Sequence, residues 1–157
     1  MQNVLVLFLC TVIESDPMAP LRLVGTKLVL PLALHSICAG FPSPADDYLD
    51  DNIDLTRLLI VNPPATFLWR VEGKSMIDAG IFPGDLVVVD RSLEPRHGDA
   101  VIAIVDGERS IKRINLRGGE LLQCANRRMV FTLPECAEVE IWGVVTWCLR
   151  GLRRTAA

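Results

Sequence analysis

Short apolar segments with strand-like periodicity recur along the chain from residue 53 onward. They predict β-strands over residues 66–71, 86–90, 100–105, 109–115, 121–124 and 139–149. Turn-forming residues separate these segments at Pro83-Gly84-Asp85, His97-Gly98-Asp99 and Gly118-Gly119. Strands this short, joined by turns without long helical patterns between them, predict a mainly β domain with an antiparallel, rolled or barrel-like sheet.

A short helix is expected just before the first of these strands. Its apolar face would consist of Leu55, Leu58 and Leu59. Asp51 or Asn52 is the predicted N-cap, because a short polar side chain can accept a hydrogen bond from the first free backbone N–H groups. The run Asn62-Pro63-Pro64 ends the helix, since proline cannot continue it.

The residues ahead of this helix differ in composition from the rest. Residues 24–34 are apolar and predict an extended arm that is broken at Pro31. Residues 41–52 contain two prolines and four aspartates, a composition typical of an extended and solvated linker. The expected organisation is an arm over residues 1–40, an acidic linker over 41–52, a compact domain over 53–150 and a basic tail over 151–157.

Length and charge limit the class of protein. The chain has 157 residues, of which 50% are hydrophobic and 22% charged, so it can bury a sizeable core in one domain. Its net charge of −3 argues against a protein whose main function is to bind nucleic acid. We therefore expect no direct sequence-specific DNA binding.

The N-terminal apolar run does not indicate a membrane protein. Residues 4–10 have no basic residue ahead of them, unlike a signal peptide, and they fall short of the ~20 apolar residues that span a bilayer. No membrane association is expected. Met18 is an alternative to Met1 as the start of the native chain, and the sequence leaves both open.

The cysteines do not form a recognisable framework. The chain has five of them, Cys10, Cys38, Cys124, Cys136 and Cys148, an odd number without a C-x-x-C pair. A disulfide framework or a zinc site is therefore not expected, and neither is any other cofactor. Reduced thiols that behave as small apolar residues are typical of a cytoplasmic protein.

A predicted hairpin puts one lysine in an apolar environment. Asp106-Gly107 between two apolar runs is a strong signal for a two-residue turn. The resulting register places Lys112 opposite Val101, with Ala103 on the same face and no carboxylate in the local ladder. Desolvation lowers the pKa of such a lysine, and a neutral lysine can accept the proton of a serine hydroxyl. The alternative is a lysine whose amine reaches water from the strand edge, which the neighbouring Arg113 favours.

A serine follows the first predicted strand in a suggestive setting. The segment Gly73-Lys74-Ser75-Met76 comes just after residues 66–71. A serine next to glycine at the end of a strand can be exposed, with backbone N–H groups free to bind an oxyanion. Taken alone, the segment is also typical of an ordinary loop.

Several segments together resemble the clan of Ser–Lys proteases that includes UmuD, LexA and signal peptidase. They are Val71-Glu72-Gly73-Lys74-Ser75-Met76, Gly84-Asp85-Leu86-Val87-Val88-Val89-Asp90, His97-Gly98-Asp99 and Ile111-Lys112-Arg113-Ile114. The spacing between Ser75 and Lys112 also matches. The segment Ala39-Gly40-Phe41-Pro42-Ser43-Pro44-Ala45, followed by acidic residues, is similar to the UmuD branch, in which the scissile bond precedes Gly-Phe-Pro-Ser-Pro.

The resemblance implies a fold and a reaction. The fold would be the rolled antiparallel β-sheet domain of LexA and signal peptidase, with a short helix and an extended N-terminal arm. Ser75 would attack the Ala39 carbonyl and cut the bond to Gly40, with Lys112 as the base. The backbone N–H groups of Lys74 and Ser75 would hold the oxyanion.

The resemblance also implies partners. Members of the UmuD branch cut themselves when bound by a RecA–single-stranded DNA filament. The shortened product forms a homodimer and joins a UmuC-like Y-family DNA polymerase in translesion synthesis during SOS mutagenesis. The resemblance therefore implies the same partners and DNA-repair role for this chain.

Three other interpretations make different demands on the sequence. A LexA-like repressor needs a helix-turn-helix ahead of the cut, which an apolar segment with Pro17, Pro20 and Pro31 does not supply. A signal peptidase needs a membrane anchor. A subunit that binds a polymerase without cutting is disfavoured by the intact reactive residues, but it stays open.

Two further groups are expected to have no role in the chemistry. His97 lies in a predicted turn and His35 on the arm, so both are interpreted as structural or solvated. Arg150, Arg153 and Arg154 are interpreted as part of a solvated tail.

Overall fold

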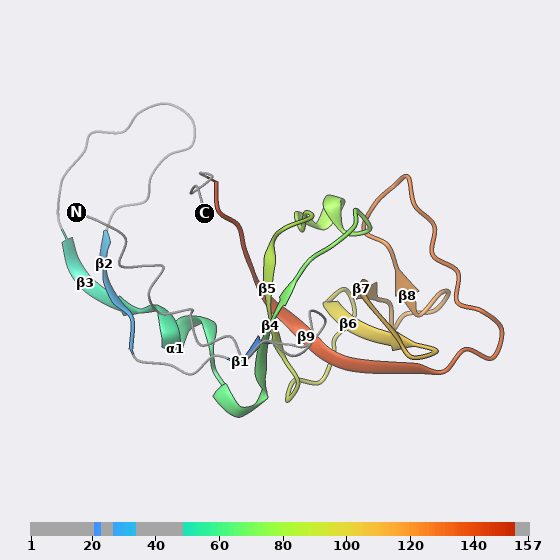
Figure 1. Ribbon diagram of the computed structural model, residues 1–157, viewed down its shortest axis with the longest axis horizontal. Helices are drawn as coiled ribbons and strands as arrows, with labels where there is room; N and C mark the ends of the chain where they lie inside the picture. The colour runs from blue at the N-terminus through green and yellow to red at the C-terminus, as the bar shows by residue number, and fades with distance from the viewer. Residues whose placement is uncertain (1–20, 23–26, 34–48, 153–157) are drawn as a thin grey trace.

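The computed structural model describes residues 21–22, 27–33 and 49–152 (Figure 1). The elements are β1 (Leu21–Arg22), β2 (Val29–Ala33), β3 (Leu49–Asp54), α1 (Leu55–Leu59), the 3-10 turn η1 (Pro63–Ala65), β4 (Thr66–Arg70), the 3-10 turn η2 (Ile77–Ala79), β5 (Leu86–Asp90), β6 (Ala100–Val105), β7 (Glu108–Ile114), β8 (Leu122–Gln123) and β9 (Val139–Leu149). The predicted strands all form: the bounds of β5, β6 and β9 agree with the expected ones, and those of β4, β7 and β8 differ by one residue at one or both ends.

The main body is one antiparallel sheet of seven strands in the order β1-β4-β5-β9-β6-β7-β8. The long strand β9 pairs with β5 on one side and with β6 on the other, and Figure 1 shows it running through the middle of the molecule. Register shifts at Val88/Val89 and at Ile102/Ala103 bend the sheet at this strand. The predicted mainly β, rolled antiparallel fold is confirmed.

Gly143 allows β9 to lie close to β5. A Cβ at this position would be 2.8 Å from Cγ1 of Val89 and 3.2 Å from the carbonyl oxygen of Asp90. A side chain would therefore push the two strands apart at the point where the sheet bends. The glycine in an otherwise apolar strand is explained by this contact.

Apolar side chains pack on both faces of the sheet. One buried cluster consists of Val71, Met76, Ile81, Val87, Val89, Ile102, Ile111 and Ala125. The other consists of Val101, Ala103, Ile114, Leu122 and Val144. Successive residues of β6 and β7 alternate between the two clusters, as the period of a strand requires.

The segment before the helix differs from the expectation. β3 covers residues 49–54, so the last four residues of the expected linker, 49–52, form a strand that pairs with β2. Pro31 does not break the arm: it lies within β2 opposite Asn52. A strand of a two-stranded ribbon has one unpaired edge, where the missing N–H of proline costs no hydrogen bond. Residues 41–48 lie outside the described part, and the division into arm, linker and domain stays a prediction.

The short helix is confirmed, but its cap is not the expected one. The N-cap is Asp54, whose carboxylate accepts a hydrogen bond from the Arg57 N–H at 3.1 Å. Asp51 and Asn52 belong to β3 instead, because pairing with the arm extends the strand up to the helix. Among the helices that the structure describes, none is long and apolar enough to cross a bilayer.

Candidate active site

Ser75 lies on the turn between β4 and η2. Backbone hydrogen bonds between Val71, Gly84 and Asp85, each 2.8 Å long, close the base of this loop. Gly73 adopts a φ of +77°, a left-handed conformation that favours glycine, and Met76 anchors the turn with a side chain that is only 1% exposed. Ser75 itself is half-buried, and its Oγ lies 3.5 Å from the carbonyl oxygen of Ile111 on β7.

Lys112 is buried on β7, in the register that the sequence predicted. The hairpin pairs Val101 with Lys112. The lysine is 6% exposed, and its neighbours Val101 and Ala103 are fully buried. Burial lowers its pKa from the ordinary value of 10.5, an effect that Cys124 partly offsets. The alternative in which the amine reaches water from the strand edge is therefore wrong.

The side chains of Ser75 and Lys112 converge on one atom. Lys112 Nζ donates a hydrogen bond to the carbonyl oxygen of Ile111 at 3.2 Å, and Ser75 Oγ donates to the same oxygen. The shared acceptor places the two donor atoms in one region of the site, and catalytic hydrogen bonds are often long before substrate binds. The ring of Phe131 covers the amine, with its centroid 4.8 Å from Nζ. The site therefore contains a hydroxyl beside an amine whose charged form is disfavoured.

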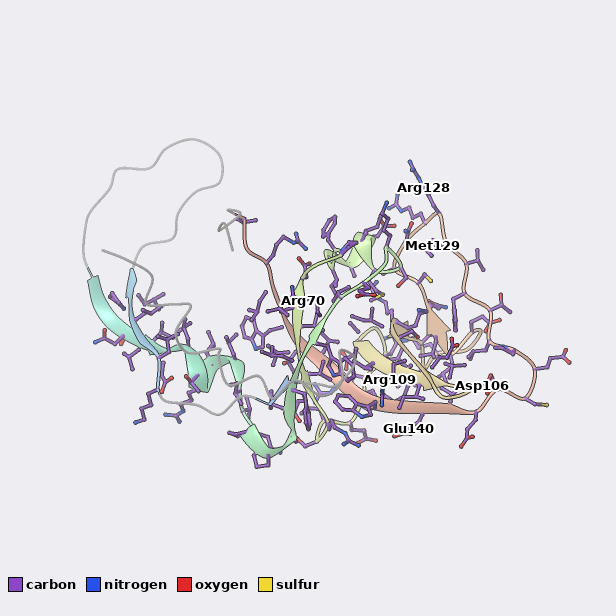
Figure 2. The ribbon with its side chains drawn as sticks, in the orientation of Figure 1. Arg70, Asp106, Arg109, Arg128, Met129 and Glu140 are labelled. Carbon is purple, nitrogen blue, oxygen red and sulfur yellow. The ribbon has the colours of Figure 1, made fainter. Side chains whose placement is uncertain are left out.

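The loop after β8 holds the serine turn in place. Asn126 is 8% exposed and donates from Nδ2 to the Lys74 carbonyl at 2.7 Å. The Asp78 N–H donates to the Ala125 carbonyl at 2.7 Å, and the Arg127 N–H donates to the Asp78 carboxylate at 2.8 Å. Figure 2 shows the next residue, Arg128, pointing away from the body.

Sequence reasoning missed Asn126. Its only sequence signal is an amide directly after the apolar run that ends at Ala125. The side chain is one of the few polar groups that the structure buries. Buried polar groups almost always have partners, and the partner of this amide is the Lys74 carbonyl in the serine turn.

Arg150 does not belong to a solvated tail, which corrects the expectation. Its Nε donates to Oδ1 of Asp85 at 2.7 Å, and its Nη2 binds the second oxygen of the same carboxylate. This hydrogen bond holds the pKa of the 3% exposed Asp85 well below its usual range, and the pair raises the pKa of Arg150. Nη2 also donates to the Gly80 carbonyl, so the chain end fixes the loop that follows Ser75.

His97 takes no part in this site. His97 is exposed, and its Nδ1 accepts a hydrogen bond from the Leu116 N–H at 3.2 Å, which confirms a structural role. His35, Ala39, Gly40, Arg153 and Arg154 lie outside the described residues. Within the described ranges, no three His, Cys, Asp or Glu side chains are grouped as a metal site would require, and Cys124, Cys136 and Cys148 are free thiols.

Comparison with known proteins identifies the relatives of the chain. The sequence profile of the Peptidase S24-like family matches residues 31–146, a range that includes both Ser75 and Lys112. Protein ImpA of Salmonella typhimurium is 43% identical over 125 residues, which cover 80% of this chain and 86% of ImpA.

Two further relatives support the same grouping. Protein MucA of Escherichia coli is 42% identical over 122 residues, or 76% of this chain and 84% of MucA. The LexA repressor of Dechloromonas aromatica is 35% identical over 143 residues, or 89% of this chain and 70% of the repressor. The resemblance to the UmuD and LexA group, stated above from the motifs, is confirmed.

Proposed function

Because this chain belongs to the Peptidase S24-like family, we propose that it is a serine endopeptidase that cleaves its own bond between Ala39 and Gly40. Ser75 is the nucleophile and Lys112 the general base. The observation that carries the proposal is the convergence of Ser75 Oγ and the buried Lys112 Nζ on the carbonyl oxygen of Ile111.

The proposed reaction uses a neutral lysine. Lys112 Nζ takes the proton of Ser75 Oγ as the oxygen attacks the carbonyl carbon of Ala39. The backbone N–H groups of Lys74 and Ser75 stabilise the oxyanion. The lysine ammonium then gives the proton to the departing Gly40 amine, which breaks the peptide bond and leaves an acyl ester on Ser75. Water hydrolyses the ester with Lys112 again as the base.

The surroundings of Lys112 suit this cycle. An exposed lysine is almost fully protonated at neutral pH and cannot act as a base. Burial among Val101, Ala103 and Ile114 disfavours the ammonium. The scissile segment belongs to the same chain as the nucleophile, so cleavage needs a docked geometry but no diffusional encounter.

We infer a wider role from the relatives and the sequence motifs. Cleavage would release a product of residues 40–157, which forms a homodimer and acts as an accessory subunit of a UmuC-like Y-family polymerase in translesion synthesis. A RecA–single-stranded DNA filament would speed cleavage by favouring the docked arm, a shift in population. The identity to ImpA and MucA over most of the chain supports this role.

One experiment tests the activity, the scissile bond and the activator together. The purified chain is incubated with RecA, single-stranded DNA and a slowly hydrolysed ATP analogue, and intact masses are followed over time. A parallel series from pH 7 to pH 10 omits the filament. We expect a fragment that begins at Gly40, absent from the Ser75→Ala variant, and a rate that rises with pH as Lys112 loses its proton. If no such fragment forms in either series, the chain is a binding subunit with a protease fold.

A further inference from the structure

We propose that Asn126 is a positioning residue that aims the Ser75 N–H at the oxyanion. This inference rests on the proposed self-cleavage and adds to it the residue that orients one of its two oxyanion donors. Asn126 itself touches neither the scissile bond nor the reacting oxygen. It acts through the peptide group that joins Lys74 to Ser75.

The peptide bond between Lys74 and Ser75 ties the direction of one group to that of the other. The carbonyl of Lys74 and the N–H of Ser75 belong to one planar trans peptide, so they point in opposite directions. Asn126 Nδ2 binds that carbonyl at 2.7 Å and thereby fixes the plane of the peptide. The Ser75 N–H must then point away from Asn126. Within the described part of the chain, no group accepts a hydrogen bond from this N–H.

Asn126 is itself held rigidly. Its Oδ1 accepts a hydrogen bond from the Arg128 N–H at 3.0 Å, so both ends of the carboxamide are engaged and its orientation is set. Its 8% exposure leaves little water to compete for its own amide group. A Ser75 N–H whose direction is fixed in this way is what preorganised stabilisation of charge requires.

The loop that contains Asn126 is also connected to the strand of Lys112, the proposed base. It follows β8, whose Leu122 pairs with Ile114 on β7, the strand of Lys112. The Asp78 N–H binds the Ala125 carbonyl of the same loop, on the other side of Ser75. One segment therefore links the strand of the base to both flanks of the nucleophile. A small displacement of this segment would move the Ser75 N–H relative to the attacking Ser75 Oγ.

A single substitution separates the two hydrogen bonds of Asn126. Asn126→Asp keeps the size of the side chain and the acceptor for the Arg128 N–H, but an ionised carboxylate cannot donate to the Lys74 carbonyl. Asn115→Asp is the matched control. The Asn115 side chain also accepts from the N–H two residues later, that of Arg117, at 3.1 Å and donates to the Gly118 carbonyl, in a turn away from Ser75.

The first readout is the pH profile of self-cleavage without the filament. We expect Asn126→Asp to lower the plateau rate at alkaline pH by about 10- to 100-fold, somewhat less than the loss of a direct oxyanion donor. The plateau, and not the midpoint, is the readout, because the added carboxylate lies near the site and stabilises the Lys112 ammonium, which raises the midpoint. Asn126→Gln, which keeps the amide donor, should recover part of the rate, and Asn115→Asp should match the unmodified chain. An unchanged plateau for Asn126→Asp, or no recovery with Asn126→Gln, would overturn the proposal.

A second readout does not require turnover. The probe is a peptide of residues 34–38 that ends in a boronic acid analogue of Ala39. Its boron bonds to Ser75 Oγ and forms a tetrahedral adduct that carries an oxygen at the oxyanion position. We expect at least tenfold weaker binding to Asn126→Asp than to Asn115→Asp, and none to Ser75→Ala.

The outcomes distinguish the two proposals. Equal affinity for Asn126→Asp and the control, in a chain that binds the probe, refutes the positioning role alone. If the unmodified chain neither cleaves itself nor binds the probe, the proposed function fails and the role of Asn126 fails with it. Thermal unfolding of each variant, measured in parallel, shows whether a slow variant is folded at the assay temperature. A loss of rate confined to temperatures where Asn126→Asp unfolds would also refute the role.

Discussion

Replacing the buried lysine should make the folded chain more stable while it abolishes the proposed self-cleavage. Lys112 carries a charge into an apolar site, and burial lowers its pKa below 10.5. The unfolded chain therefore binds this proton more tightly than the folded one. Methionine has a similar length and no charge, so Lys112→Met should remove the cost of burying the ammonium.

The size of the gain follows from the linkage between protonation and folding. Each unit by which burial lowers the pKa costs the folded state about 1.4 kcal/mol at neutral pH. For a lysine that is 6% exposed among fully buried valine and alanine side chains, we expect a gain of about 1–3 kcal/mol at pH 7. In a protein of this length, each kcal/mol raises Tm by roughly 2–4 °C.

The sign of the pH dependence makes the test specific. Between the lowered pKa of Lys112 in the folded chain and 10.5, its value in the unfolded chain, the unfolded chain binds more protons than the folded one. The free energy of unfolding of the chain with Lys112 therefore rises with pH across this window. The advantage of Lys112→Met should therefore shrink as the pH rises and vanish above about 10.5. Thermal and urea unfolding from pH 7 to pH 11 would measure this difference in stability. Both the unmodified chain and Lys112→Met would carry Ser75→Ala to prevent cleavage. Exposed Lys74→Met is the control.

A destabilised Lys112→Met chain at pH 7 would refute the reasoning. So would a gain that is the same at every pH, because that would reflect packing of the methionine and not removal of a buried charge. A pH-dependent gain of equal size for Lys74→Met would show that the effect does not depend on burial.

Three further substitutions test the packing around the site by urea and thermal unfolding. Asp85→Ala should cost about 2–3 kcal/mol at pH 7, because it leaves the Phe82 N–H, now 2.8 Å from the carboxylate, without an acceptor. Because the folded state lowers the pKa of Asp85, this carboxylate stabilises the fold above pH 3.8 and loses that effect in acid. The stability deficit of Asp85→Ala should therefore shrink as the pH falls below 3.8, and a deficit that grows in acid would contradict this. Gly143→Ala should cost about 1–3 kcal/mol through the contact with Val89, and a neutral effect would show that the strands separate freely. Met76→Ala should cost about 2–5 kcal/mol and slow self-cleavage, and an unchanged rate would mean that this anchor does not position the serine.

Much of the strand layout was predictable because its signals are local. The bounds of β5, β6 and β9 agree with the expected ones, since apolar periodicity and turn residues are properties of short segments. The same holds for the hairpin. Asp106-Gly107 selects the turn, the turn selects the register, and the register puts Lys112 opposite Val101.

Pairing between distant segments was less predictable. The acidic residues 49–52 have the composition of a linker, yet they form part of β3 because the apolar arm strand β2 supplies a partner. Strand propensity depends on what a strand packs against as much as on its own residues. The composition of this segment alone therefore led to the wrong structure.

Sequence by itself determined the sheet, the hairpin and, through its motifs, the family. It also singled out Ser75 and Lys112, whose side chains the fold brings to one carbonyl oxygen. Only the tertiary structure decided which polar groups support them. Asn126 reaches the Lys74 carbonyl across 52 residues, and Arg150 reaches Asp85 across 65. Whether a hydrogen bond forms depends on its length to within tenths of an ångström and on its angle. The entropy of closing a loop changes little with loop length, so it does not favour one distant partner over another. The fold selects among those partners through the bend of the sheet at β9, which no short segment encodes.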